Sequence, residues 1–184
     1  MRRAFITVVF FGVVTGLLSW HGAGSVAIAG DSPASKGAFK SEKIPLQLDY
    51  PDGWIVKSNE SPEPEIPLIL KLIPETSAGK HGGIFVTAFV NHMNVGDEAL
   101  KALGNSYCEK VLKRSPDAKV SSTSDVKIGG VEAKAFRITD GAMQHEIRVL
   151  MHGEYGYTIG YVSPEKEFDE TMFNKLLDSM KWAH

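Results

Sequence analysis

Apolar and polar residues alternate along much of the chain, and this period of two predicts a protein rich in β-strands. Leu46, Leu48 and Tyr50, for example, are separated by polar residues, as in a strand with one buried face. The same pattern, bounded by glycine, proline and polar clusters, predicts strands at residues 44–50, 53–57, 66–73, 83–91, 118–128, 131–139, 142–152 and 155–162.

Two segments show a helical period instead. In the first, apolar residues recur three or four positions apart: Leu100, Leu103, Tyr107 and Val111. We predict Asn94 as its N-cap and an end before Pro116, because proline cannot continue a helix. The second is predicted to begin with Ser163 as N-cap and Pro164 at the first helical position. Its apolar stripe consists of Phe168, Met172, Phe173, Leu176, Leu177 and Met180.

Two connections between predicted strands are tight. Gly129-Gly130 and Gly153-Glu154 each separate two strand patterns by two residues, which is typical of a β-hairpin. Hairpins join antiparallel strands, and the order is four strands, a helix, four strands and a helix. We therefore predict an α+β fold, with a central antiparallel sheet of about six to eight strands flanked by helices.

The stretch LQLDYPDGWIVK interrupts the alternation at residues 51–53. Pro51 has no backbone N–H and is predicted to end the first strand. Gly53 provides the turn, and Trp54 returns to the sheet as a large apolar anchor. We interpret this stretch as a corner of the fold and not as a ligand site.

The N-terminus has the three parts of a secretory signal. Arg2 and Arg3 precede an apolar run over residues 4–18, and Ala27 and Ala29 occupy the small-residue positions of a cleavage site. We predict cleavage after Ala29 and an exported protein, periplasmic or extracellular. The apolar run is short for a spanning helix, which needs about 20 residues, and an uncleaved anchor is the alternative. The arginine pair leaves both general secretory and twin-arginine export open.

The predicted organisation is a signal peptide at 1–29, a flexible polar lead-in at 30–43 and one domain at 44–184. The chain has 20 Lys and Arg residues and 22 Asp and Glu residues. Cleavage would remove Arg2 and Arg3, so the mature domain would have 20 − 2 = 18 basic residues and a net charge of about −4. A nucleic-acid partner is not expected, because that needs a clustered basic face. Cys108 is the single cysteine and cannot form an internal disulfide; we predict that it is buried.

Candidate metal ligands are few, because the chain has neither paired cysteines nor an H-E-x-x-H motif. Alternation places Glu146, Arg148 and His152 on one face of their strand, but six residues of extended chain separate Glu146 from His152 by about 20 Å. A shared ion would therefore need His81 or His92, brought to one of them by folding. Glu146, His152, His81 and His92 form the candidate metal set.

A tyrosine-rich strand suggests a different kind of site. Tyr155, Tyr157 and Tyr161 share one face, and Gly156 and Gly160 share the other. The tyrosine face is a candidate ligand site, or it packs beneath a helix with its hydroxyls at the rim. In the second case the glycine face would admit another helix at close range. For nucleophilic catalysis there is no G-x-S-x-G motif, and we predict that the protein is not an enzyme.

Several motifs together resemble the PsbP-like superfamily, which includes the photosystem II protein PsbP and bacterial DcrB-like envelope proteins. They are a strand ending in Tyr-Pro-x-Gly-Trp, the hairpin VKIGGVEAKAF, and YGYTIGY running into SPEKEFDETMFNKLLDSMKW. The resemblance covers about residues 39–183, and it implies a central antiparallel sheet between helices and action by binding. The residues expected to be structural are Pro51, Gly53, Trp54, Gly129, Gly130 and Trp182.

The resemblance further implies a non-catalytic accessory subunit or assembly factor, bound to a protein partner at a membrane complex and peripheral to the membrane. In a photosynthetic host this would be a photosystem II-type complex, with its calcium and manganese chemistry. We expect the contacts on the loops at 57–66 and 74–83 and on one sheet edge, because function concentrates on loops held by a rigid scaffold. The alternative is an envelope carrier of a small apolar ligand or a metal ion.

Overall fold

The computed structural model describes residues 37–59, 68–75, 82–91 and 97–182. Within these residues the strands form a two-stranded and a seven-stranded sheet. The strands are β1 (Ala38–Lys40), β2 (Gln47–Asp49), β3 (Trp54–Asn59), β4 (Leu68–Pro74), β5 (Gly83–Val90), β6 (Lys119–Ile128), β7 (Val131–Asp140), β8 (Met143–His152) and β9 (Tyr155–Pro164). The helices are α1 (Asp97–Arg114) and α2 (Glu170–Ser179), with a short 3-10 helix η1 (Glu165–Glu167) before α2.

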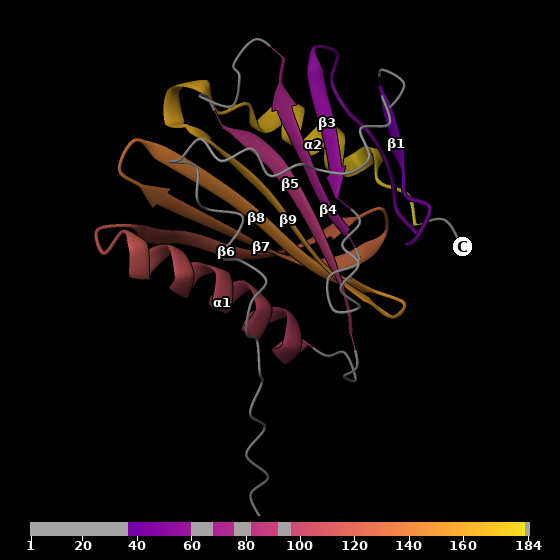
Figure 1. Cartoon of the computed structure of the whole chain (residues 1–184). Helices are drawn as coiled ribbons and strands as arrows, with labels where there is room; N and C mark the ends of the chain where they lie inside the picture. The colour runs from indigo at the N-terminus through magenta and orange to yellow at the C-terminus, as the bar shows by residue number, and fades with distance from the viewer. Residues whose placement is uncertain (1–36, 60–67, 76–81, 92–96, 183–184) are drawn as a thin grey trace, which may run out of the picture.

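The large sheet is antiparallel throughout and has the strand order β3-β4-β5-β9-β8-β7-β6 (Figure 1). The chain between β5 and β6, which contains α1, crosses from the middle of the sheet to its far edge, and the chain then returns until β9 pairs with β5. Ile128 pairs with Val131 and His152 with Tyr155, which confirms both predicted hairpins. The predicted α+β fold is also confirmed.

The two helices lie on opposite faces of the large sheet and over different parts of it (Figure 1). α1 packs mainly on β7 and β8. The buried residues of that core are Leu100, Tyr107, Cys108, Val111, Ala118, Phe136, Ile138, Ile147 and Val149. On the other face, α2 and the small sheet form a larger core in which Leu48, Tyr157 and Phe173 are fully buried. Amphipathic alternation in the strands thus produces two cores.

The first described strand lies before the predicted start of the domain. Residues 38–40 lie inside the predicted lead-in of 30–43, but they form β1, where Phe39 pairs with Leu48 and is buried. A three-residue strand shows too little alternation to be recognised among its small and polar neighbours. One buried aromatic side chain and its pairing with β2 nevertheless fix the segment on the core.

The second helix begins later than predicted. Ser163 and Pro164 are not its first residues, because they continue β9 and pair with Gln144 and Met143. Asp169 is the N-cap of α2, and its carboxylate accepts a hydrogen bond from the Met172 backbone N–H at 2.8 Å. Proline suits the end of a strand as well as the start of a helix, since its fixed φ is compatible with both. The predicted cap Asn94 of the first helix lies outside the described residues.

The stretch around residue 53 connects β2 to β3. Gly53 has a φ of +78°, a conformation that glycine adopts without steric cost, and its carbonyl accepts a hydrogen bond from the Glu75 N–H at 2.7 Å. Trp54 pairs with Pro74 and packs, partly buried, against the larger core. The stretch therefore ties the start of β3 to the end of β4.

Candidate functional site

On the face of the sheet that carries α1, the helix covers only part of the strands. Along β3 and β4, alternation places five side chains on this face: Ile55, Lys57, Ile69, Lys71 and Ile73. We call these five residues the lysine face. Ile55 is 39% exposed, one of only two large apolar side chains in the described part of the chain that are classed as exposed. Lys57 is also exposed, and the other three are half-buried.

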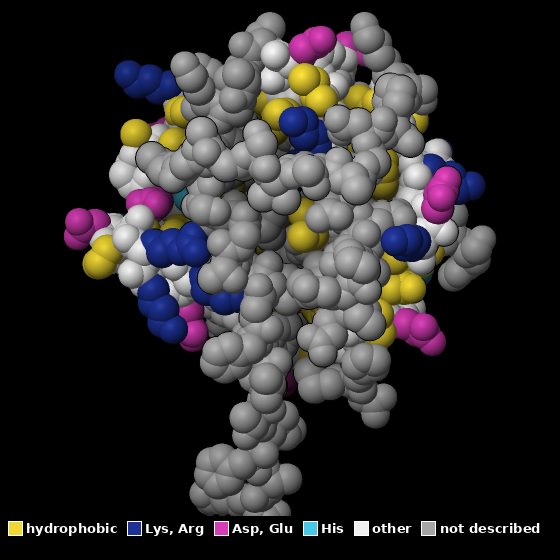
Figure 2. All heavy atoms as spheres, in the orientation of Figure 1, with side chains coloured by type: hydrophobic (Ala, Val, Ile, Leu, Met, Phe, Trp, Pro, Cys, Tyr) yellow, Lys and Arg dark blue, Asp and Glu magenta, His cyan; other side chains and the backbone are white. Residues whose placement is uncertain are grey.

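The two lysines of this face lie directly opposite each other in the register of β3 and β4. Like charges in such cross-strand positions destabilise a sheet. Neither lysine forms an ion pair with any residue that the structure describes. Figure 2 views this side of the molecule and shows a dark blue cationic side chain among yellow apolar ones over the upper ends of β3 and β4. The lysine face therefore combines unpaired positive charge with accessible apolar surface.

The three candidate tyrosines lie on the opposite face, toward α2, but they separate into two groups. Tyr161 is buried, stacks on Phe168 at 4.7 Å between ring centroids and contacts Phe173 at 5.5 Å. Its hydroxyl donates to the Glu167 carbonyl and accepts from the Asp169 N–H, both at 3.4 Å. Tyr161 thus has the contacts that the packing alternative predicts.

The other two tyrosines, Tyr155 and Tyr157, belong to an aromatic cluster at the start of β9. Tyr157 lies 6.3 Å from Tyr155 and 4.9 Å from Trp182 between ring centroids, and Trp182 lies 5.3 Å from His152. Tyr157 is fully buried, and its hydroxyl has no hydrogen-bond partner among the described residues. Burial raises the pKa of this phenol. An unpaired buried hydroxyl is uncommon and calls for an explanation.

The glycines on the other face of β9 do not receive a helix, contrary to the expectation from sequence. A Cβ on Gly156 would lie 2.2 Å from the ring of Phe89, and one on Gly160 would lie 2.1 Å from the ring of Phe85. The phenylalanine rings of β5 therefore occupy the space above both glycines. Phe85 in turn stacks on Tyr107 of α1, at 6.0 Å between centroids, so the helix contacts this part of the sheet through an aromatic ring.

The structure describes two of the four candidate metal ligands. His81 and His92 lie outside the described residues. Glu146 and His152 share the α2 face as predicted, but Glu146 is held by two arginines and His152 packs on Trp182. In the described ranges no three His, Cys, Asp or Glu residues are close enough together to hold a metal ion.

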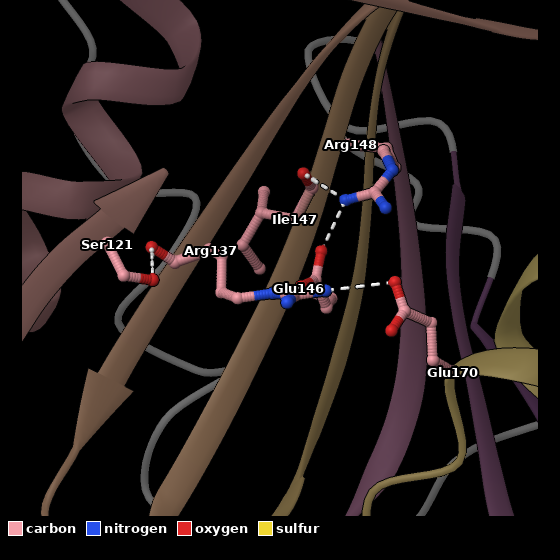
Figure 3. Close-up of polar contacts among 6 residues, drawn as sticks. All are labelled: Ser121, Arg137, Glu146, Ile147, Arg148 and Glu170. Carbon is pink, nitrogen blue, oxygen red and sulfur yellow. Dashed lines mark hydrogen bonds and ion pairs between the residues drawn. The ribbon is translucent and has the colours of Figure 1, made fainter. Parts of the chain in front are cut away.

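Glu146 belongs to an ionic network that sequence analysis did not recognise as a unit (Figure 3). Its two carboxylate oxygens accept from different residues, Arg137 Nε and, at 2.6 Å, Arg148 Nη1. Arg137 also reaches Glu170 at the start of α2, at 2.9 Å. Glu146 and Arg148 are both buried. The sequence did place Glu146 and Arg148 on one face, but the register of β7 was needed to bring Arg137 opposite Glu146.

The α1 face contains a buried polar pair and the single cysteine. The Tyr107 hydroxyl lies 3.4 Å from His145 Nδ1, and burial lowers the pKa of this imidazole. Cys108 is buried, as predicted, and burial raises the pKa of its thiol. A reactive thiol needs the opposite shift and access to solvent, so Cys108 has the surroundings of a core residue.

Solved structures of other proteins share this architecture. The solution structure of cyanobacterial PsbP (CyanoP) from Synechocystis sp. PCC 6803 superposes with a TM-score of 0.59 over 86% of this chain and 99% of that one, at 14% identity. This chain has the PsbP-like fold. A crystal structure from Bacteroides thetaiotaomicron VPI-5482 gives a TM-score of 0.53 at 15% identity over 80% of this chain. Our chain aligns with about half, 48%, of the Bacteroides chain.

No protein-family profile and no curated protein matches the sequence. At these identities the likeness to solved structures concerns the fold, because one fold supports unrelated functions. No helix in the described part of the chain is both long and apolar enough to cross a bilayer. The PsbP-like fold thus defines the scaffold that holds the lysine face, the aromatic cluster and the ionic network.

Proposed function

We propose that this protein is a non-catalytic, exported binding protein that acts as an accessory subunit or assembly factor at a membrane complex. In a photosynthetic host the proposed complex is of the photosystem II type. The PsbP-like fold supports this class of role, and the lysine face is the observation that carries it. On this face two unpaired lysines lie opposite each other beside the exposed Ile55.

The proposed partner presents carboxylates between apolar side chains. A carboxylate placed over the two lysines would relieve their mutual repulsion, and the isoleucines would lose water-exposed surface. Charge complementarity of this kind increases the rate of encounter and selects the partner. β3 is also an edge strand of the sheet, which agrees with the expectation that one sheet edge takes part in binding.

The test is affinity capture from the host of a tagged protein with both lysines reversed, Lys57→Glu and Lys71→Glu. The matched control changes the same charge elsewhere, at Lys119→Glu on β6 and Lys175→Glu on α2, both exposed. Mild cross-linking and mass spectrometry quantify each co-purified membrane subunit. The proposal predicts a subunit that the wild type and control retain and the double variant loses. A complex retained equally by all three proteins, or no membrane subunit with any of them, would refute it.

We propose as a second candidate that the protein carries a small apolar ligand. The unpaired hydroxyl of Tyr157, buried beside Tyr155 and Trp182, favours a ligand with one hydrogen-bond acceptor on an apolar body. A carrier would show a ligand-dependent rise in melting temperature without any partner. In a screen of apolar ketones and quinones, a rise that Tyr157→Phe abolishes would support the carrier, and its absence would reject these ligands.

A further inference from the structure

The ionic network on the α2 face contains an arginine whose donors are only partly used. Arg148 lies in the middle of β8 between Ala135 of β7 and Ile159 of β9, and the residue is 8% exposed. Its Nη1 donates to Glu146 Oε2 at 2.6 Å and to the Ile147 carbonyl at 3.2 Å. Arg148 makes no other hydrogen bond to any of the described residues. Nε and Nη2 therefore have N–H donors to spare.

These spare donors form one edge of the guanidinium, and that edge reaches solvent. Within the described residues, no nitrogen of Arg148 is both buried and without a partner, so the spare donors are accessible. Figure 3 shows the remaining nitrogens of Arg148 directed away from Glu146. The Nε–Nη2 edge is the one that forms two parallel hydrogen bonds with a carboxylate.

Arg148 has fewer carboxylate contacts than Arg137, although the two arginines and two glutamates of the network balance in formal charge. Glu146 is the single carboxylate in contact with it, and Glu146 is shared with Arg137. Arg137 has a further carboxylate, Glu170, whereas Arg148 has none. A guanidinium that is mostly buried is expected to have both charge compensation and full hydrogen bonding. Among the described residues, the donors on the open edge of Arg148 have no acceptor.

The surroundings suit a small ligand. The guanidinium carbon lies 5.6 Å from the centroid of the Phe173 ring, so an aromatic side chain of α2 bounds one side. On the neighbouring strands, Ala135 of β7 pairs with Arg148, and Ser124 of β6 pairs with Ala135. Both are short, and Ser124 is exposed. We propose that Arg148 is the receptor of a carboxylate-binding site at this border of the α2 face, which takes a carboxylate between Phe173 and the β6–β7 strands.

The site is independent of the lysine face, because the two lie on opposite faces of the sheet. The test is a titration of ¹⁵N-labelled protein with sodium acetate at constant ionic strength, in which the arginine Nε–H signals are followed. Chloride serves as the reference anion. Arg137 is an internal control, because its Nε already donates to Glu146. The proposal predicts a saturable shift of the Arg148 signal with acetate and little change at Arg137.

Arg148→Lys is the matched variant, because lysine retains the charge beside Glu146 but has no two-donor edge. We expect this variant to keep the circular dichroism spectrum of the wild type. Its affinity for acetate should be at least about tenfold lower, because one charge-assisted hydrogen bond is lost. In the cell the carboxylate comes either from an acidic side chain of the partner or from a free acid, and affinity capture with Arg148→Lys separates these two sources. Loss of the membrane subunit assigns the carboxylate to the partner, and retention assigns it to a free acid.

Two results of the titration would overturn the proposal. The first is an Arg148 signal that does not move with acetate. The second is a shift that does not saturate or that chloride reproduces, which would show an adventitious ion only. In that case the wild type and Arg148→Lys would also respond alike to acetate.

Discussion

Removal of one buried oxygen atom should make this protein more stable. The hydroxyl of Tyr157 is buried and has no partner among the described residues, and an unsatisfied buried polar group costs about 1–3 kcal/mol. Tyr157→Phe removes that group and keeps the ring that packs 4.9 Å from Trp182. The free energy of unfolding should therefore rise by about 1–3 kcal/mol, and the melting temperature by roughly 2–4 °C for each kcal/mol.

Tyr161→Phe is the matched control for this prediction. Its hydroxyl does have partners, the Glu167 carbonyl and the Asp169 N–H, so its removal should lower stability by about 0.5–1.5 kcal/mol. Urea unfolding followed by circular dichroism measures both variants against the wild type. If both variants were destabilised to the same degree, the Tyr157 hydroxyl would have a partner, and the carrier hypothesis would lose the observation that supports it.

Three further predictions test other parts of the structure. Gly160→Ala should destabilise the protein by about 1–3 kcal/mol, because its Cβ would lie 2.1 Å from the ring of Phe85; a double-mutant cycle with Phe85→Leu should reveal coupling in urea unfolding. Glu146→Gln should cost about 3–5 kcal/mol, because it leaves Arg148 without its carboxylate; a loss as small as that of Gln144→Ala would contradict this. Burial lowers the pKa of His145 below its usual 6.5. The contribution of the neutral imidazole to the free energy of unfolding is therefore complete above pH 6.5 and is lost as the pH falls below it. Unfolding at neutral pH and about one unit below 6.5 should show this loss, and His145→Gln should reduce it.

Alternation along the strands was sufficient to predict most of the sheet. β6 to β9 were found from their patterns because each is ten residues long, and glycines at 129 and 153 marked two of the turns between them. β1 was missed because three residues do not establish a period. The start of α2 was misplaced because Ser163-Pro164 satisfies the chemistry of a helix start, while the pairing of β9 with β8 continues through both residues. Tertiary pairing prevailed over the local signal.

The candidate sites were less predictable, because each depends on which strands become neighbours. The sequence placed Glu146 and Arg148 on one face, but not Arg137 beside them. It gave no sign that Lys57 would lie opposite Lys71, since the connection between β3 and β4 is long and does not fix a register. The tyrosines were assigned to the correct face of β9. Which of them would pack and which would keep an unpaired hydroxyl depended on how Phe168 and Trp182, which follow β9 in the sequence, fold back on it.

The width of the sheet explains why candidate sites occur on both faces. A seven-stranded sheet is too wide for one helix to cover on either face. In the described part of the chain, α1 lies on one face and α2 on the other, over different parts of the sheet. Each face therefore retains a border where sheet residues meet solvent. At one border the free groups are Lys57 and Lys71, and at the other they are the open donors of Arg148. Both are cationic in a chain whose net charge is negative, so the two proposed sites recognise the same chemistry, carboxylates, from opposite sides. Charge changes at one border should leave the other intact, because the two borders lie on opposite faces of the sheet and share no partner among the described residues, and independent sites act additively.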